Sequence, residues 1–426
     1  MPRNRPLLNA SPYIFLIIST VIRLGAALAS LKFLALQFGP STFGLLTQVM
    51  GIAAVFYLFA GGGITNGIIR NVAAASSEQE RRHWISAGYT ITVLSSIALA
   101  TVAIVLALFG SRAIFGDNGY APVFIGIAAF QILVGFGHLV LGYFSGVGDN
   151  RTFAVVQIVA SMLSLLLLVG LTHGIGLTGA MLGLVAGPSV VGVLALWRFF
   201  RQVPHHGMFR IVWDRPALMK LLSYAAVVAS SVAAVPIAQL VIRVDMSERL
   251  GWNVVGYWQA VAKISDANML FIGVIIINYL LPQLSTRSDA ASALRFLLRF
   301  GSLLLSVFIA GCAVMYAVRD SLLLIIYSDQ FLDASKLMLP QLVGDTLKTA
   351  TLLLYYFFMS RGRVLIVFVS ELALGVALYL LYLVLVPSYG AIAPIYAYAS
   401  VYAAVFLIMI GWLHLTDERR RFSRPL

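Results

Sequence analysis

Ionisable side chains lie inside several hydrophobic segments of this sequence. Lys263 and Asp266 are three residues apart in the apolar stretch 251–282, and Asp345 and Lys348 repeat that spacing further along the chain. Residues three apart share one face of a helix. A charged residue at the centre of a membrane span costs about 2.5–3.5 kcal/mol on insertion scales and usually faces a bundle interior or a water-filled cavity. The pattern predicts helices that line a polar path across a membrane.

Two interpretations explain these charges. In the first, each close pair neutralises itself and holds the second half of the chain together. In the second, a water-filled vestibule also takes up Arg23 and Glu371, which lie in further hydrophobic segments. Burying ion pairs is seldom a route to stability, whereas a vestibule accounts for all six charges. We therefore favour the vestibule.

The types of these side chains indicate what a vestibule would bind. Basic groups suit a phosphate or diphosphate, arginine through its fork and lysine as a point charge. Desolvated carboxylates can titrate or bind a cation, as coupling to H⁺ or Na⁺ requires. The predicted anion-binding residues are Arg23, Lys263 and Lys348, and the predicted ion-coupling residues are Asp266, Asp345 and Glu371.

Neutral polar and aromatic groups add to this set. Asn66 and Gln259 offer hydrogen bonds that suit sugars or the kink of a broken helix. Trp258 lies where its helix is expected to meet the outer membrane interface, either in the interfacial aromatic belt or stacked on sugar rings in the outer mouth of the path. Residues 61–67 are rich in glycine but lie in a hydrophobic helix, which indicates close helix packing or a kink rather than a phosphate loop.

Other chemistries have no motif in this sequence. It contains no P-loop, dinucleotide-binding or zinc-protease pattern. Its one cysteine, Cys312, excludes a disulfide framework, and no Cys/His spacing of the zinc kind occurs, so neither a metal site nor a cofactor is expected. A net charge of +13 could indicate nucleic acid, but the basic residues fall at the ends of hydrophobic segments. We expect a protein that is not an enzyme and binds no nucleic acid.

The elements that carry these residues are predicted to be membrane-spanning helices. The 426 residues are 61% hydrophobic and only 11% charged, with a mean hydropathy of +0.95, whereas soluble domains are about 25% charged. A span needs roughly 20 apolar residues, and twelve segments of sufficient length occur. They cover about residues 12–38, 43–70, 82–109, 120–146, 151–172, 175–200, 216–243, 252–281, 290–318, 334–360, 363–386 and 390–414.

The placement of charge predicts the orientation and the domains. If both termini are cytoplasmic, most basic residues outside the spans fall on the cytoplasmic side and only a few, such as Arg243, fall on the other, which satisfies the positive-inside rule. The only long cytoplasmic link lies at the midpoint of the chain. We predict a six-helix bundle at residues 1–200, a linker at 201–215 and a second six-helix bundle with a basic tail at 216–426.

The two predicted bundles also share recurring residues. Gly39 matches Gly251 and Gly44 matches Gly256 at one constant offset, and polar residues near helix ends recur at the same offset. Six helices per half give both halves the same orientation, so the repeat is parallel and its pseudo-two-fold axis lies along the membrane normal. A substrate would then lie between the halves.

Three stretches resemble a known family. They are FGPSTFGLLTQ at 38–48, GYWQAVAKISDA at 256–267 and QLVGDTLK at 341–348. They are similar to the Wzx flippases, in the polysaccharide-export branch of the MOP superfamily, and within it to the enterobacterial common antigen translocase group. The similarity extends over nearly the whole chain.

The resemblance implies a V-shaped, MATE-like pair of helix bundles in the bacterial inner membrane. Members of the family move an undecaprenyl-diphosphate-linked oligosaccharide, of the O-antigen or enterobacterial common antigen type, from the cytoplasmic to the periplasmic leaflet, where a polymerase and a chain-length regulator are expected partners. The charged positions that match those of relatives are Arg23, Arg70, Asp266, Asp345, Lys348 and Glu371.

Three other functions compete with this one. A cation-coupled multidrug or small-molecule exporter of the same superfamily would carry cationic cargo, against which the three basic residues of the vestibule argue. A flippase for the peptidoglycan precursor usually has fourteen helices, and this sequence predicts twelve. A non-transporting scaffold for glycan enzymes would tolerate neutralisation of Lys263 or Lys348.

Overall fold

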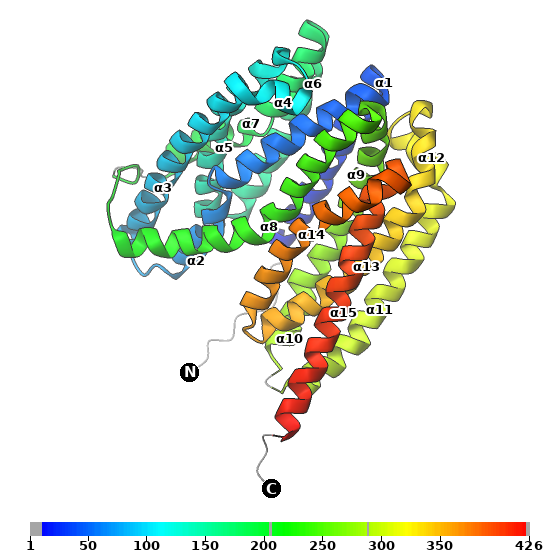
Figure 1. Ribbon diagram of the computed structural model, residues 1–426. Helices are drawn as coiled ribbons and strands as arrows, with labels where there is room; N and C mark the ends of the chain where they lie inside the picture. Colours follow the sequence, from blue (N-terminus) through cyan, green and yellow to red (C-terminus); the bar gives the residue numbers. More distant parts are fainter. Residues whose placement is uncertain (1–10, 204–206, 288, 423–426) are drawn as a thin grey trace. The chain divides into compact units, whose positions relative to one another are not determined.

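The computed structural model describes residues 11–203, 207–287 and 289–422, and every regular element in these ranges is helical (Figure 1). Seven helical stretches among the described residues are long and apolar enough to cross a membrane. The expectation of an all-α, multi-pass membrane protein is confirmed. The count of twelve spans and the cytoplasmic location of both termini stay predictions.

Two long helices are broken where the sequence places segment boundaries. Helix α1 (Ser11–Phe59) is interrupted at Gly39, whose φ of 69° lies in the left-handed region, and Pro40 follows. Glycine accepts that conformation without a steric penalty, and proline is suited to the first turn of the helix that resumes after it. Helix α6 (Asn150–Ala186) breaks in the same way at Gly176, with φ of 62°. The first break falls between the first and second expected segments, and the second falls at the first two residues of the sixth expected segment.

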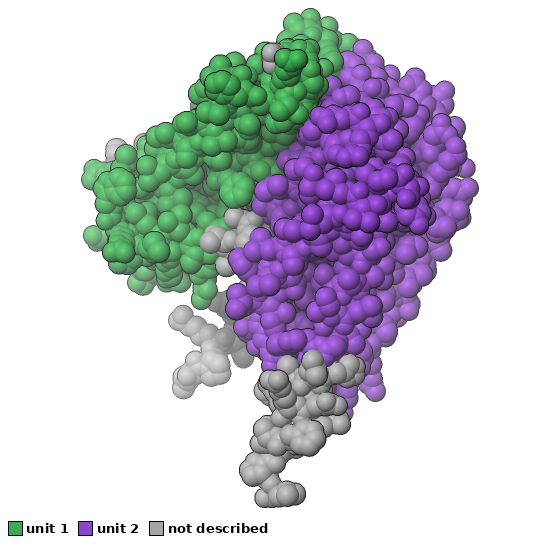
Figure 2. Space-filling view, viewed as in Figure 1, with its two compact units in different colours: residues 1–34, 49–229 green, residues 35–48, 230–426 purple. Residues whose placement is uncertain are grey.

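By packing, the chain forms two compact units (Figure 2). Unit 1 comprises residues 1–34 and 49–229, and unit 2 comprises residues 35–48 and 230–426. The division between the units falls after residue 229, inside the helix that follows the predicted linker. The predicted bundles at 1–200 and 216–426 and the linker at 201–215 stay predictions.

Among the described residues, unit 1 comprises the two ends of α1 (up to residue 34 and from residue 49), the start of α8 and six further α-helices. They are α2 (Thr65–Ala74), α3 (Glu78–Val105), α4 (Ser111–Phe115), α5 (Ala121–Gly146), α6 and α7 (Ser189–Gln202). A π-helical turn, Leu106–Gly110, joins α3 to α4. Ile68, Leu139 and Phe199 are fully buried in its core, which unites α2, α3, α5 and α7. The unit therefore packs around its own hydrophobic centre.

The glycine-rich run 61–67 lies where α1 ends, in unit 1. Gly61 has φ of 112° and precedes a short 3₁₀ turn, Gly62–Ile64, before α2 begins. A Cβ atom at Gly63 would lie 2.7 Å from the backbone of Ala225. The interpretation of this run as a kink with close helix packing is confirmed.

Unit 2 is built from the remaining helices. They are the later part of α8 (Arg215–Leu250), α9 (Trp252–Ile275), α10 (Leu281–Ser285), α11 (Ala290–Ala317), α12 (Arg319–Ile326), α13 (Met338–Ser360), α14 (Val364–Tyr389) and α15 (Ala393–Phe422). A π-helical turn, Ile276–Leu280, continues α9 into α10, and a 3₁₀ helix, Asp329–Leu337, precedes α13. Helix α13 packs extensively against α15, α11 and α9, so it lies at the centre of the unit.

The segment 35–48 of α1 packs in unit 2 through glycines. A Cβ atom at Gly44 would lie 2.5 Å from the carbonyl oxygen of Trp252 and 2.8 Å from the nitrogen of Gly256. One at Gly256 would lie 2.0 Å from the carbonyl oxygen of Pro40. Gly44 and Gly256, which the constant offset pairs in the sequence, therefore lie against each other, as small residues at close helix crossings do.

Candidate functional site

A buried carboxylate in unit 2 has three donors on one of its two oxygens. Asp345 Oδ1, in α13, accepts hydrogen bonds from Ser265 Oγ at 2.6 Å, Gln341 Nε2 at 3.0 Å and the Tyr398 hydroxyl at 3.0 Å. Asp345 is fully buried, and its Oδ2 has no hydrogen-bond partner among the described residues. A buried acceptor without a partner is costly, which marks Oδ2 as a place for a proton or a small cation.

Asp345 and Lys348 do not form the ion pair that their spacing suggests. Within the described ranges, no ion pair joins them: Ser265, Gln341 and Tyr398 all bond Asp345 Oδ1, and Lys348 does not reach Oδ2. Lys348 Nζ instead lies 5.8 Å from the ring centroid of Tyr398 and 5.7 Å from that of Tyr402. These are cation–π distances. The interpretation of this pair as self-neutralising is therefore wrong.

Lys263 and Asp266, in contrast, do form an ion pair. Their charged groups are 3.1 Å apart on one face of α9, and their side chains are 27% and 62% exposed. Glu371, in α14, is half-buried and lies within electrostatic reach of Lys348. Unit 2 thus holds both signs of charge on α9, α13 and α14, at different depths from its surface.

A small polar cavity adjoins these groups inside unit 2. Its volume is about 30 Å³, which is room for a water molecule or an ion but not for a sugar. Its lining includes the polar residues Gln239, Ser265, Asp266, Gln341, Lys348 and Tyr398, and also Trp258. The cavity joins the exposed Lys263–Asp266 face to the bonding partners of Asp345.

Trp258 and Gln259, predicted to bind substrate, are both buried in α9. Gln259 Oε1 accepts a hydrogen bond from Arg243 Nη1 at 2.9 Å. Arg243, which the charge count placed on the outer side, is only 4% exposed and lies inside the helix packing of unit 2; the side of the membrane stays a prediction. A buried guanidinium needs acceptors, and Gln259 supplies one. The stacking role of Trp258 on sugar rings stays a prediction.

The predicted residues of unit 1 lie on exposed positions. Arg23 in α1 is exposed, and the described part of the chain offers it no hydrogen-bond or ion-pair partner. Asn66 and Arg70 are both exposed, one turn apart on α2, and Arg70 Nη1 donates to the Tyr224 hydroxyl at 2.9 Å. Unit 1 therefore presents two basic groups that an anion could reach.

Four residues of unit 2 were missed by sequence reasoning. Ser265, Gln341, Tyr398 and Arg243 are the partners that organise the buried polar groups. Gln341 lies one turn before Asp345, a spacing that could have been noticed. The others come from different helices, and only the packing brings them together. No group of three or more His, Cys, Asp and Glu side chains that could hold a metal ion lies within the described residues.

Comparisons with known proteins give matches over most of the chain. A family profile described as polysaccharide biosynthesis protein matches residues 12–287. The lipid III flippases of Escherichia coli (strain K12) and Shigella flexneri are each 27% identical over 403 residues, which cover 94% of this chain and 97% of the relative.

Solved structures are similar in fold. An inward-facing multidrug resistance MATE transporter of the MOP superfamily has a TM-score of 0.79 at 14% identity and covers 95% of this chain and 99% of its own. The lipid II flippase MurJ, in an inward closed conformation, has a TM-score of 0.74 at 13% identity, over 95% and 88% of the two chains. At such identities the likeness shows the fold alone.

Proposed function

Because the chain belongs to the polysaccharide biosynthesis protein family, we propose that it is a flippase for an undecaprenyl-diphosphate-linked oligosaccharide. The family profile and the curated relatives confirm the resemblance to Wzx-type flippases of the MOP superfamily. Those relatives are named flippases, which are transport proteins and not enzymes. The observation that carries the proposal is the match to lipid III flippases across nearly the full length of both chains.

The cargo sets a physical problem that charged helices can solve. A diphosphate and its sugars are strongly hydrated, and moving them through hydrocarbon without compensation carries a large desolvation cost. Arg23 and Arg70 of unit 1 and Lys263 and Lys348 of unit 2 offer cations for the diphosphate, since all four are exposed or half-buried. The polyprenyl chain stays in lipid throughout. The cargo would cross from the cytoplasmic to the periplasmic leaflet of a bacterial inner membrane by alternating access, and a glycan polymerase with its chain-length regulator would consume it.

We propose that transport is coupled to a monovalent cation that binds Asp345 in unit 2. Asp345 Oδ2 is buried without a partner in the described residues, and the polar cavity of about 30 Å³ lies among the groups that bond Oδ1. A proton or Na⁺ at Oδ2 changes the charge buried beside Tyr398 and Lys348. A cation shifts a conformational equilibrium only if it binds one state better than the other, so a single buried carboxylate whose bonds come from α9, α13 and α15 is suited to this role.

A cation-coupled multidrug exporter is the second candidate function. The MATE transporter shares the fold, but its identity to this chain is too low to carry the cargo over. Growth in cationic dyes, with and without the protein, tests this alternative. Unchanged dye resistance is expected.

The deciding experiment measures lipid-linked glycans in cells depleted of the protein. Mass spectrometry identifies the undecaprenyl-diphosphate species, and accessibility to a glycan-specific reagent in intact cells and in inverted vesicles reports the leaflet. Accumulation of one species in the cytoplasmic leaflet is expected and names the cargo. An unchanged pool and distribution would refute the proposed function.

A further inference from the structure

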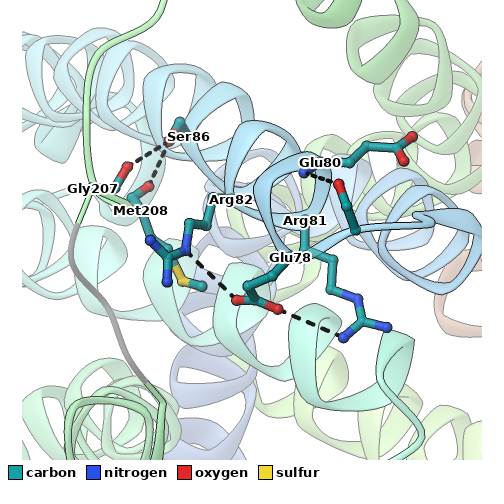
Figure 3. Close-up of polar contacts among 8 residues, drawn as sticks. Glu78, Glu80, Arg81, Arg82, Ser86, Gly207 and Met208 are labelled. Carbon is teal, nitrogen blue, oxygen red and sulfur yellow. Dashed lines mark hydrogen bonds and ion pairs between the residues drawn. The ribbon is translucent and has the colours of Figure 1, made fainter.

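Residues 207–214, here called the strap, connect α7 to α8 and are fastened to α3 within unit 1. The Ser86 hydroxyl donates to the carbonyl oxygens of Gly207, at 3.3 Å, and Met208, at 2.9 Å (Figure 3). Further along, the backbone nitrogen of Val212 donates to Thr90 Oγ1 at 2.9 Å. The strap is therefore bonded to α3 at two positions about one helical turn apart.

The end of the strap and the start of α8 form a groove with the outer face of α3. This α3–α8 groove has a volume of about 550 Å³. Its lining is apolar except at two positions and consists of Ile91, Leu94, Ser95, Trp213, Arg215, Leu218, Met219 and Leu222. All of these residues belong to unit 1.

The apolar side chains of the groove are strongly exposed. Trp213 is 74% exposed, Met219 59% and Leu94 47%. Leu94 lies in a helical stretch, Glu78–Phe115, that is long and apolar enough to span a membrane. An exposed apolar face on such a helix is solvated by lipid chains. The occupant that fits the long wall of this groove is therefore an acyl chain.

One cation lies at the rim of the groove without an internal acceptor. Arg215 is exposed, and the described residues offer it no hydrogen bond or ion pair. The adjacent Asp214 carboxylate is engaged by His83 Nε2 at 2.8 Å. A second nearby cation, Lys220, lies 4.8 Å from the ring centroid of Trp84. The carboxylate of Asp214 is thus engaged by His83, and that of Glu80 lies within electrostatic reach of Lys220. Arg215 is left without a carboxylate partner among the described residues.

The arginines near the start of α3 show the opposite arrangement. Arg81 and Arg82 flank Glu78, at 3.7 Å and 3.8 Å from its carboxylate (Figure 3). Arg81 and Arg82 thus have an acceptor within the chain, whereas the Arg215 guanidinium is left available to an anion from outside it.

From this geometry we infer that the α3–α8 groove binds an anionic phospholipid of the cytoplasmic leaflet. The acyl chain lies along Leu94 and Met219, and the phosphate accepts hydrogen bonds from the Arg215 guanidinium, whose fork matches phosphate geometry. Trp213, which lines the groove with Arg215, covers the junction between the two parts, as aromatic side chains at membrane interfaces do. This site lies outside the set of residues assigned to the transported cargo.

The test uses the purified full-length protein in detergent and native mass spectrometry. Phosphatidylglycerol and phosphatidylcholine with identical chains are titrated separately, and the bound fraction of each is compared. A basic residue near an anionic lipid surface contributes about 1 kcal/mol, which corresponds to about a fivefold change in binding. Arg215→Gln is therefore expected to weaken phosphatidylglycerol binding about fivefold and to leave phosphatidylcholine binding unchanged.

Two matched variants complete the design. Arg112→Gln removes the same charge from another exposed position of unit 1, in α4, and is expected to bind both lipids as the wild type does. Arg215→Lys keeps the charge and is expected to retain most of the preference for phosphatidylglycerol. Equal binding of the two lipids by the wild type, or equal losses in Arg215→Gln and Arg112→Gln, would overturn the inference.

Discussion

Replacing Asp345 separates its role as a hydrogen-bond acceptor from its role as a charge. Asp345→Asn keeps a carbonyl oxygen where Oδ1 accepts bonds from Ser265, Gln341 and Tyr398. Asp345→Ala removes that acceptor. Both variants abolish a titratable carboxylate, so any difference between them in stability reports the hydrogen bonds.

The expected loss of stability in Asp345→Ala follows from the hydrogen-bond donors that lose their acceptor. In Asp345→Ala, Gln341 can keep its bond to Ser265 Oγ at 3.2 Å, but the hydroxyls of Ser265 and Tyr398 lose their acceptor. An orphaned buried donor costs about 1–3 kcal/mol, so the two together destabilise the protein by about 2–6 kcal/mol. For Asp345→Asn we expect a smaller loss of about 1–3 kcal/mol, because the three existing donors keep their acceptor and only the new amide N–H₂, in the place of Oδ2, lacks a partner.

The assay is thermal unfolding of the purified protein in detergent, combined with transport of lipid-linked glycan in cells. The expected order of midpoint temperatures is Asp345→Ala below Asp345→Asn, and Asp345→Asn below the wild type. Equal midpoints for the two variants would refute the acceptor network. For transport, Asp345→Asn should fold but lose its dependence on pH and on Na⁺ together with its activity. Ion-dependent export at the wild-type rate by Asp345→Asn would refute the coupling role.

Asp266→Asn is the matched control, because it removes the same charge from an exposed side chain of unit 2. The Asp266 side chain is 62% exposed and pairs with Lys263, and exposed pairs contribute less than about 1 kcal/mol. Its midpoint temperature should therefore equal that of the wild type.

Three further predictions test other parts of the structure. Gly256→Ala places a Cβ 2.0 Å from the carbonyl oxygen of Pro40 and should destabilise unit 2 by about 1–3 kcal/mol. In the same helix, the Cβ of Gly273→Ala meets no atom within 4 Å, so this variant should be neutral or stabilising by up to about 1 kcal/mol. Thermal unfolding of both variants checks this, and equal midpoint temperatures would contradict the close packing at Gly256. Asp289 caps α11, and hydrogen bonds from two backbone N–H groups hold its pKa below the usual 3.8. Its stabilising contribution is therefore complete above pH 3.8 and is lost as the pH falls through the lowered pKa, so Asp289→Asn should show a weaker loss of stability in an acid titration of the unfolding midpoint. Arg23→Gln should abolish glycan export while the protein stays folded and inserted, because this exposed side chain has no acceptor among the described residues; normal export by that variant would contradict its role with the diphosphate.

The class of the protein was determined by the sequence, for physical reasons that act locally. Long apolar segments with few charges cannot be stable in water as separate elements, and in a bilayer their backbone groups must bond within each helix. The break in α1 was also encoded locally, because Gly39 and Pro40 favour a left-handed residue followed by a new helical turn. The pairing of Lys263 with Asp266 needed only the helical repeat.

The tertiary structure decided which groups surround the buried charges. The same spacing that pairs Lys263 with Asp266 does not pair Asp345 with Lys348, because helical periodicity says which residues share a face but not what packs against it. Two of the hydrogen-bond donors to Asp345 are Ser265 and Tyr398, which are 80 and 53 residues away in the sequence. The burial of Arg243 likewise depends on neighbouring helices that its own segment does not specify.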